Sequence, residues 1–224
     1  MKVLALLPMK GNSERVPNKN LRDFAGKPLY HRTMNVLISS KYIEKVVVNT
    51  DSEIIKKDLF ENFKDHVIVI DRPQEIRGDM VSMNKIIEHD IHQVEADFYI
   101  QTHSTNPLLK TTSVNSAVEK MAVLSDKGVY DSVFSVTKLQ TRLYKGNGEA
   151  YNHDPNELLR TQDLEPLFEE NSNFYIFTKE SFVNSGGKRI GVSPFMFEID
   201  KIEAVDIDEP QDFTIAETLY KLLS

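Results

Sequence analysis

Two short stretches near opposite ends of this 224-residue chain carry side chains that suit a metal–phosphate ligand. The first follows an apolar strand predicted over residues 3–7 and holds Lys10, Gly11, Ser13 and Lys19 in a polar loop. Backbone N–H groups, which glycine leaves accessible, and ammonium groups would together suit a triphosphate. The spacing fits neither a Walker A sequence nor the Rossmann glycine fingerprint. An ordinary solvated loop between a strand and a helix would have a similar composition.

The second stretch, residues 204–208, places two aspartates two positions apart in an apolar, β-like context. In an extended segment the carboxylates of Asp206 and Asp208 face the same way, with Cα atoms roughly 7 Å apart, while Ile207 points into the core. Such a pair can share Mg²⁺ with phosphate oxygens. Alternatively, one aspartate caps the last helix, which is predicted to begin at Pro210, and the other is a surface charge.

Charge is distributed unevenly along the chain. The net charge of −7 argues against a nucleic-acid partner. Residues 10–27 hold five basic side chains against two acidic ones, whereas residues 198–217 hold eight acidic side chains against one basic. The two segments could meet over a metal–phosphate ligand, or each could form a solvated face.

Hydropathy and cysteine content narrow the class of protein. No apolar run reaches the length of a membrane span, so no membrane partner is expected. Because residues 1–3 already lead into the first strand, neither a signal peptide nor a transit segment is expected. The chain has no cysteine, which excludes disulfides and thiolate chemistry and fits a cytoplasmic location.

Apolar runs and helical spacing alternate through the first half of the chain. Strands are predicted over residues 3–7, 43–50, 67–70 and 97–101, each followed by a segment with helical periodicity. This alternation predicts an α/β fold with a doubly wound, mostly parallel sheet and helices on both faces. In such sheets the ligand lies beyond the carboxyl ends of the strands.

The pattern changes in the second half. Strands are predicted over residues 131–138, 173–177 and 192–197, but residues 141–162 have little periodicity. We therefore expect a single domain with a smaller, antiparallel or irregular lip at about 139–172, a common place for sugar binding or dimer contacts.

The polar loop resembles the first loop of the CMP-sugar synthetases, the acylneuraminate cytidylyltransferases. In that family an apolar strand is followed by Arg, two residues, Ser and, later, Lys-Asn. Ser13, Lys19 and Asn20 match in place, Lys10 stands where the family usually has Arg, and Glu14 stands where Lys is common.

Four further segments resemble the same family, in the same order along the chain. Residues 72–82 look like its nucleotide-recognition loop, and residues 105–108 look like its Thr-Ser-Pro-Leu turn. A weaker match over residues 160–175 falls in the region that contacts the sugar acid in the family. Residues 204–212 resemble the C-terminal motif in which both aspartates bind metal.

The resemblance implies a Rossmann-like sheet of the nucleotide-diphospho-sugar transferase type. It implies transfer of CMP from CTP to the anomeric hydroxyl of a 2-keto-3-deoxy sugar acid, with release of pyrophosphate, Mg²⁺ as cofactor and a homodimer. The implied site comprises catalytic Lys10, Lys19 and Asp208; nucleotide contacts from Lys10, Ser13, Lys19, Asn20, Arg72 and Ser82; substrate contacts from His103, Arg160, Gln162, Asn171 and Tyr175; and metal ligands Asp206 and Asp208.

Departures from the family pattern fall on the sugar side. His103 replaces a common Gln, Glu169 stands where sialic-acid enzymes can have a basic residue, and Ser172 replaces a Gly. They bear on which sugar acid is used more than on the cytidylyl chemistry. Two alternatives remain: a sugar-1-phosphate nucleotidylyltransferase on the same fold, and a non-catalytic nucleotide-binding protein.

Overall fold

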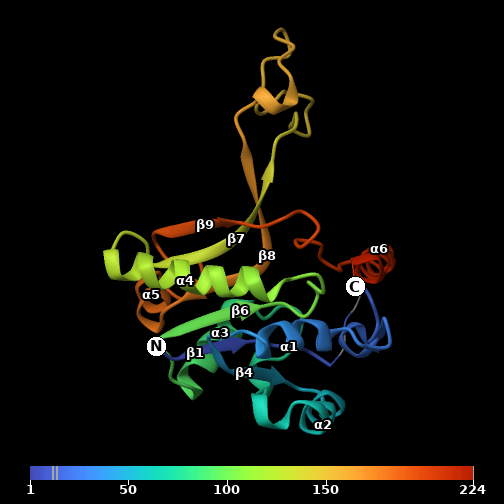
Figure 1. Cartoon of the computed structure of the whole chain (residues 1–224), viewed down its shortest axis with the longest axis vertical. Helices are drawn as coiled ribbons and strands as arrows, with labels where there is room; N and C mark the ends of the chain where they lie inside the picture. Colours follow the sequence, from blue (N-terminus) through green and yellow to red (C-terminus); the bar gives the residue numbers. More distant parts are fainter. Residues whose placement is uncertain (12, 14, 224) are drawn as a thin grey trace.

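The computed structural model describes residues 1–11, 13 and 15–223, and one large sheet forms its centre (Figure 1). In this described part of the chain seven strands follow the order β5-β4-β1-β6-β8-β7-β9. They are β1 (Val3–Leu6), β4 (Ile43–Thr50), β5 (Val67–Asp71), β6 (Phe98–Thr102), β7 (Ser132–Leu139), β8 (Leu167–Phe177) and β9 (Pro194–Glu198). All neighbours pair in parallel except β8, which is antiparallel to both β6 and β7. The predicted mostly parallel sheet is confirmed.

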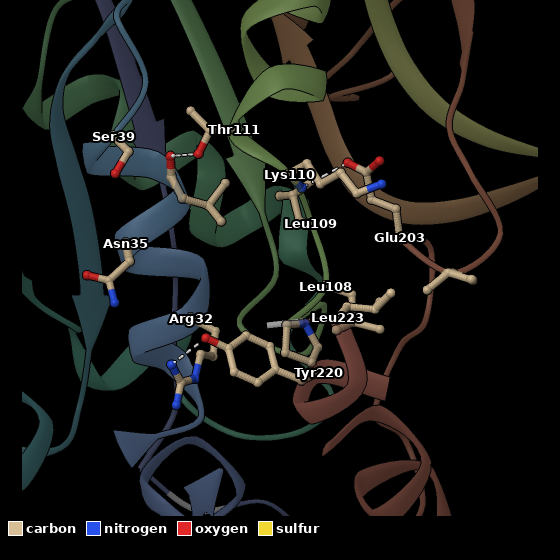
Figure 2. Close-up of a pocket in the computed structure, with 13 residues that line it drawn as sticks. Arg32, Asn35, Ser39, Leu108, Leu109, Lys110, Thr111, Glu203, Tyr220 and Leu223 are labelled. Atoms are coloured by element: carbon tan, nitrogen blue, oxygen red, sulfur yellow. Dashed lines mark hydrogen bonds between the residues drawn. The ribbon is translucent and has the colours of Figure 1, made fainter. Parts of the chain in front are cut away.

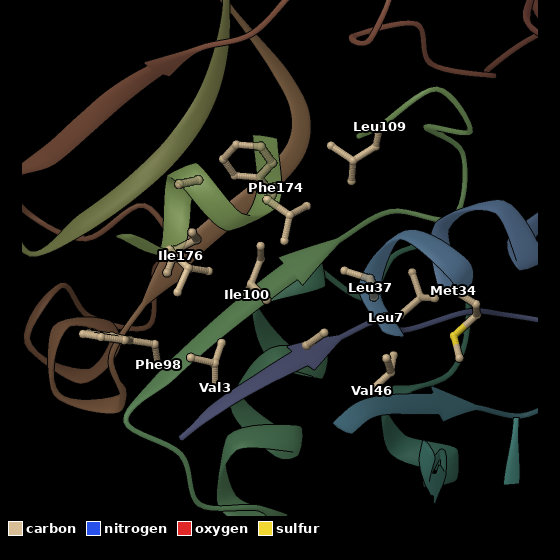
Figure 3. Close-up of a cluster of buried hydrophobic side chains, with 14 of the residues drawn as sticks. Val3, Leu7, Met34, Leu37, Val46, Phe98, Ile100, Leu109, Phe174 and Ile176 are labelled. Carbon is tan, nitrogen blue, oxygen red and sulfur yellow. The ribbon is translucent and has the colours of Figure 1, made fainter. Parts of the chain in front are cut away.

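Helices cover both faces of the sheet. The α-helices of the described residues are α1 (Tyr30–Ile38), α2 (Glu53–Asn62), α3 (Met83–Gln93), α4 (Thr111–Lys127), α5 (Lys179–Asn184) and α6 (Pro210–Leu223). In β1, Val3 and Ala5 belong to one buried cluster and Leu4 and Leu6 to the other, because successive side chains of a strand point to opposite faces. Helices α1, α2 and α4 pack on the first cluster (Figure 3), and α3 and α5 on the second.

None of the helices within the described ranges combines the length and the apolarity needed to cross a membrane.

A third buried cluster holds α6 against a small hairpin formed by β2 (Asp23–Phe24) and β3 (Lys27–Pro28). The rings of Phe24 and Phe213 meet edge to face with centroids 5.5 Å apart, and Ile207 is fully buried beside them. This packing brings the segment before α6 next to the loop after β1. The two ends of the chain that carry the charged stretches therefore lie together.

Residues 140–166 form an arm that extends from the ends of β7 and β8, away from the sheet (Figure 1). Its internal order consists of a bridge between Tyr144 and Ala150 and a short 3₁₀ helix over Thr161–Asp163. The side chain of Leu158 on this arm is 90% exposed. The stretch with little periodicity is thus an extended projection that packs little against the rest of its own chain.

Candidate active site

A cavity of about 510 Å³ opens at the carboxyl ends of β1, β5 and β6, the edge of the sheet where a ligand was expected. Its walls come from the loop after β1, the loop after β5, the turn after β6 and the segment before α6. Among the predicted site residues it is lined by Lys10, Ser13, Lys19, Asn20, Arg72, His103, Asp206 and Asp208.

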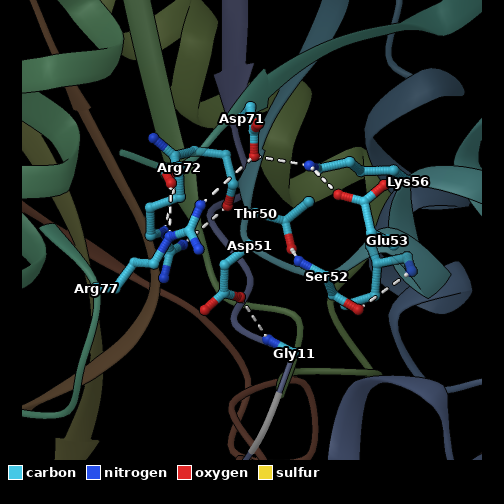
Figure 4. Close-up of polar contacts among 11 residues, drawn as sticks. Gly11, Thr50, Asp51, Ser52, Glu53, Lys56, Asp71, Arg72 and Arg77 are labelled. Atoms are coloured by element: carbon cyan, nitrogen blue, oxygen red, sulfur yellow. Dashed lines mark hydrogen bonds and ion pairs between the residues drawn. The ribbon is translucent and has the colours of Figure 1, made fainter. Parts of the chain in front are cut away.

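The loop after β1 is held to the end of β4 through a close approach that needs glycine. The backbone N–H of Gly11 donates to Asp51 Oδ1 at 2.8 Å (Figure 4). A Cβ atom on Gly11 would lie 2.9 Å from the Cβ of Ser52, which is too close without a shift of the backbone. Glu14, which departs from the family pattern, lies outside the described residues.

The basic loop and the acidic segment meet at this cavity. Arg15 Nη2 lies 2.6 Å from Asp208 Oδ1, and Arg15 Nη1 lies 3.6 Å from Glu209. Lys19 Nζ donates to the carbonyl oxygen of Ile207 at 2.5 Å, and burial lowers the pKa of Lys19 while Asp206 and Asp208 oppose this effect. The expectation that the two charged segments lie together is confirmed.

Asp206 and Asp208 both line the cavity, while Ile207 between them is fully buried in the third cluster. The segment forms no strand among the described residues, and it is held by the Ile207 N–H, which donates to the Thr105 carbonyl at 3.0 Å. Neither aspartate caps α6, because among the described residues no backbone N–H of its first turn donates to Asp206 or Asp208, and the Asp212 N–H donates to the Glu209 carbonyl at 3.1 Å. The capping alternative is therefore wrong.

The chemistry of this aspartate pair fits a hard cation. Asp206 Oδ1 is buried and has no hydrogen-bond partner among the described residues. Burial raises the pKa of Asp206, a hydrogen bond with Thr105 offsets part of this effect, and the nearby charge of Asp208 adds to it. A buried carboxylate oxygen without a donor beside a second carboxylate is the kind of oxygen ligand that Mg²⁺ takes, with phosphate oxygens completing its coordination.

The residues assigned to nucleoside binding also form hydrogen bonds that connect neighbouring strands of the sheet. Arg72 is 4% exposed, and it donates through Nε to Asn49 Oδ1 at 2.7 Å and through Nη2 to the carbonyls of Asn49 and Met9. Asn20 donates to the Lys10 carbonyl at 3.1 Å and accepts from Ser104 Oγ at 2.6 Å. These side chains join the ends of β1, β4 and β6, so their positions are fixed before a ligand binds.

Arg189, from the loop after α5, also lines the cavity and contacts side chains of β6 and β8. The guanidinium of Arg189 stacks on the Tyr175 ring at 3.8 Å and donates through Nη1 to Gln101 Oε1 at 2.6 Å. The same Nη1 lies 3.4 Å from His103 Nε2. Burial, with the nearby charges of Arg189 and Lys19, lowers the pKa of His103 to about 3, so this imidazole is neutral near pH 7.

A family model for cytidylyltransferases matches residues 4–223, which is nearly the whole chain. The chain belongs to the cytidylyltransferase family. It is therefore a nucleotidyltransferase, and the recognition of the CMP-sugar synthetases from sequence motifs is confirmed.

Curated members of this family resemble the chain along its length. A pseudaminic acid cytidylyltransferase of Campylobacter jejuni is 27% identical over 235 residues, covering 99% of this chain and 97% of that protein. An N-acylneuraminate cytidylyltransferase A of Danio rerio is 30% identical over 96% of this chain, which spans 50% of that longer protein.

A solved structure supports the fold. A CMP:2-keto-3-deoxy-manno-octonic acid synthetase complexed with CTP superposes with a TM-score of 0.72 at 15% identity, covering all of both chains. The expected nucleotidyltransferase-type sheet is thus confirmed.

The predicted site residues do not all gather at the cavity of this family member. Arg160 and Gln162 lie on the arm, and Arg160 is paired there with Asp163 through Nε at 2.6 Å and Nη2 at 3.0 Å. Ser82 caps α3, where its Oγ accepts from Lys85 N–H at 3.4 Å, and it lines a different cavity. Whether these three residues contact substrates stays a prediction.

Asn171 and Tyr175 lie on β8, beside the cavity. Asn171 donates to Thr137 Oγ1 at 2.8 Å and lines an adjoining cavity of about 530 Å³, whose wall also includes Ser172, Asp206 and Asp208. Tyr175 lies under Arg189 and donates to Glu170. The two cavities share Ser172, Asp206 and Asp208 in their walls, so they adjoin each other.

Arg189 is the cavity residue that the sequence interpretation missed. It follows a glycine pair in a loop with no helical or strand periodicity, and no spacing in the chain links it to β6 or β8. Only the folded loop places it against Gln101 and Tyr175. No local signal could have identified it.

A separate cavity of about 380 Å³ lies between α1, α6 and the loop before α4 (Figure 2). Its lining includes Arg32, Tyr220 and Glu203, and Arg32 Nη1 donates to the Tyr220 hydroxyl at 2.8 Å. Glu203 accepts from Lys110 N–H at 2.9 Å and from Ser113 Oγ at 2.9 Å, so it anchors the start of α4. No predicted site residue lines this cavity.

Proposed function

We propose that the chain transfers the cytidylyl group of CTP to the anomeric hydroxyl of a 2-keto-3-deoxy sugar acid and releases pyrophosphate. The observation that carries this proposal is the meeting of Lys10 and Lys19 with Asp206 and Asp208 around one cavity. Cations suit the triphosphate, and the carboxylate pair suits the metal that accompanies it.

Different residues of the cavity are assigned to different parts of CTP. Lys10, Ser13 and Lys19 bind the triphosphate, with Lys19 held in place by its bond to the Ile207 carbonyl. Asn20, Arg72 and Ser82 are assigned to the cytidine end. These groups hold the α-phosphorus in line with the incoming hydroxyl, and positioning with charge neutralisation supplies most of the rate enhancement.

Asp206 and Asp208 would hold Mg²⁺, which suits the buried, unpartnered Oδ1 of Asp206. When bound, the ion would neutralise phosphate charge and make the anomeric hydroxyl more acidic. Lys19 lies close enough to both aspartates to limit repulsion between them and the phosphates.

The arm supports a homodimer as part of this proposal. Leu158 is 90% and Leu159 47% exposed on a projection that makes few contacts with its own sheet, and such apolar side chains suit burial against a second copy. In a dimer, Arg160 and Gln162 would reach an acceptor in the partner's cavity. Their predicted role in substrate binding therefore depends on association.

The test is a pyrophosphate-release assay over the four ribonucleoside triphosphates, with a panel of pseudaminic, N-acylneuraminic and 2-keto-3-deoxy-manno-octonic acids and, separately, a set of sugar 1-phosphates. We expect release that requires CTP, Mg²⁺ and at least one sugar acid. Turnover with sugar 1-phosphates instead would favour the sugar-1-phosphate alternative. Binding of CTP without release under any condition would favour a non-catalytic protein.

A further inference from the structure

The loop that carries Arg189 is fixed to the sheet at several points. The Asp131 carboxylate accepts from the N–H groups of Val192 and Ser193 at 2.8 and 2.9 Å, and Ser132 Oγ donates to the Ile190 carbonyl. Gly191 has φ of +73°, and a Cβ there would lie 2.3 Å from Asp131 Oδ1. The position of Arg189 is therefore set by the backbone around it.

The guanidinium of Arg189 contacts the protein through its planar face and Nη1, whereas its Nε and Nη2 groups have no protein partner among the described residues. Its face lies on the Tyr175 ring, and Nη1 donates to the fully buried Gln101. Nε and Nη2 form no hydrogen bond with the described residues. These two groups are the pair with which arginine binds a carboxylate through two parallel hydrogen bonds.

The other arginines with predicted or observed roles at the site have no such open pair. Arg15 is paired with Asp208 and Glu209. Arg72 donates hydrogen bonds through Nε and Nη2 to Asn49 and Met9. Arg160 donates through both Nε and Nη2 to the Asp163 carboxylate. Across residues 1–11, 13 and 15–223, Arg189 forms no ion pair, and it lines the cavity.

The adjoining cavity explains where the rest of an acceptor would lie. Glu169, Glu170, Asp206 and Asp208 line it, with Lys201 as the single basic side chain in its wall. Such a wall repels a carboxylate and accepts hydrogen bonds from hydroxyl groups. An acid with a polyhydroxyl chain would thus place its hydroxyls against β8 and its carboxylate toward Arg189.

We propose that Arg189 binds the carboxylate of the acceptor through Nε and Nη2, and so selects sugar acids over neutral sugars. This rests on the proposed function, because it names how that site recognises its acceptor. Tyr175 and Gln101 hold the guanidinium plane, and neutral His103 adds no second cation beside it. The acceptor carboxylate is thereby bound within one chain, at a site separate from the arm.

The test compares Arg189→Gln and Arg189→Lys with Lys188→Gln, which removes the same charge from the neighbouring, exposed position in the loop. Each protein is assayed with the best acid of the panel and with its carboxamide, at saturating CTP. We expect wild type and Lys188→Gln to prefer the acid by roughly 10- to 100-fold in kcat/KM. Arg189→Gln should lose most of that preference, with the KM for CTP unchanged.

The lysine variant should recover only part of the preference, because an ammonium lacks the planar fork. Arg189→Lys also keeps the test possible if Arg189→Gln is too unstable to fold, which its melting temperature would show. Preference for the acid that survives both substitutions would overturn the proposal. A larger effect on the KM for CTP than on that for the acid would also overturn it, because Arg189 would then contact the triphosphate.

A binding measurement separates this inference from the proposed function. Each acid of the panel is titrated by calorimetry into protein saturated with α,β-methylene CTP, which prevents transfer. Binding to wild type that is lost in Arg189→Gln supports the carboxylate site even where no pyrophosphate is released. Normal turnover with unchanged acid binding in Arg189→Gln overturns only the role of Arg189, and no acid binding to wild type overturns both.

Discussion

Asp90 offers a test of the network that supports the nucleotide end of the cavity. This α3 carboxylate is fully buried; Oδ1 accepts from Asn49 Nδ2 at 2.5 Å, and Oδ2 has no partner among the described residues. Asn49 in turn accepts from Arg72 Nε. Burial raises the pKa of Asp90 from 3.8 to about 6, against the opposing effects of Asn49 and His89.

The sign of the pH dependence follows from that shift. Because the native pKa lies above the unfolded value, the native protein binds this proton more tightly. The stability that results is complete below about pH 3.8 and is lost as the pH rises through about 6, where the buried group ionises. A change in pKa from 3.8 to about 6 corresponds to about 3 kcal/mol of unfolding free energy. This is an upper limit, because a charged His89 would favour the ionised form of Asp90 and reduce the effect.

The perturbation is Asp90→Asn, because asparagine resembles the protonated carboxyl in shape and can still accept from Asn49. We expect the variant to be more stable than wild type at pH 8 and equal to it near pH 4, with most of the change between pH 4 and 6.5. Urea unfolding across this range measures the difference, and Asp126→Asn, an exposed carboxylate on α4, is the control. A difference between variant and wild type that stays constant with pH would refute the reasoning.

The remaining predictions concern the cavity and the arm. Lys19→Ala should weaken CTP binding by about 1.5–3 kcal/mol in calorimetry and leave the fold intact, because it removes one phosphate contact; unchanged affinity would place the triphosphate elsewhere. Asp206→Asn and Asp208→Asn should each abolish most pyrophosphate release, and the double variant should lose little more, because the two act as a unit; near wild-type turnover in the double variant would contradict a shared metal. Arg160→Lys should raise the KM for the sugar acid with little change for CTP, whereas a larger effect on CTP would count against its assignment to the acceptor.

Elements with strong local patterns could be predicted closely from the sequence. β4 spans Ile43–Thr50, the same residues as its β-branched run, because the polar residues after it open α2. β8 begins at Leu167, six residues before the predicted strand. Residues such as Glu169 and Glu170 give no strand alternation, and they are extended because they pair with Thr137 and Val136 of β7.

The same division holds for the site. The aspartate pair could be predicted because its two-residue spacing and the buried Ile207 are local features. The loop cations could be predicted because they follow a recognisable strand. The role proposed for Arg189 depends on its contacts with Gln101, which is 88 positions away, and with Tyr175 on β8. The projection of the arm (Figure 1) depends on what the rest of the chain leaves uncovered. Neither is encoded in a short stretch.

The position of the arm, outside the sheet at the ends of β7 and β8, has a consequence for how such proteins can diverge. The pairing of β7 with β8 ends at Leu139 and Leu167. Residues 140–166 contribute no side chain to the three buried clusters, although Leu164 is itself buried. Insertions and deletions there leave the ladder intact. Natural selection can therefore vary the length and chemistry of the arm without changing the packing of the sheet or the residues at the carboxyl ends of its strands.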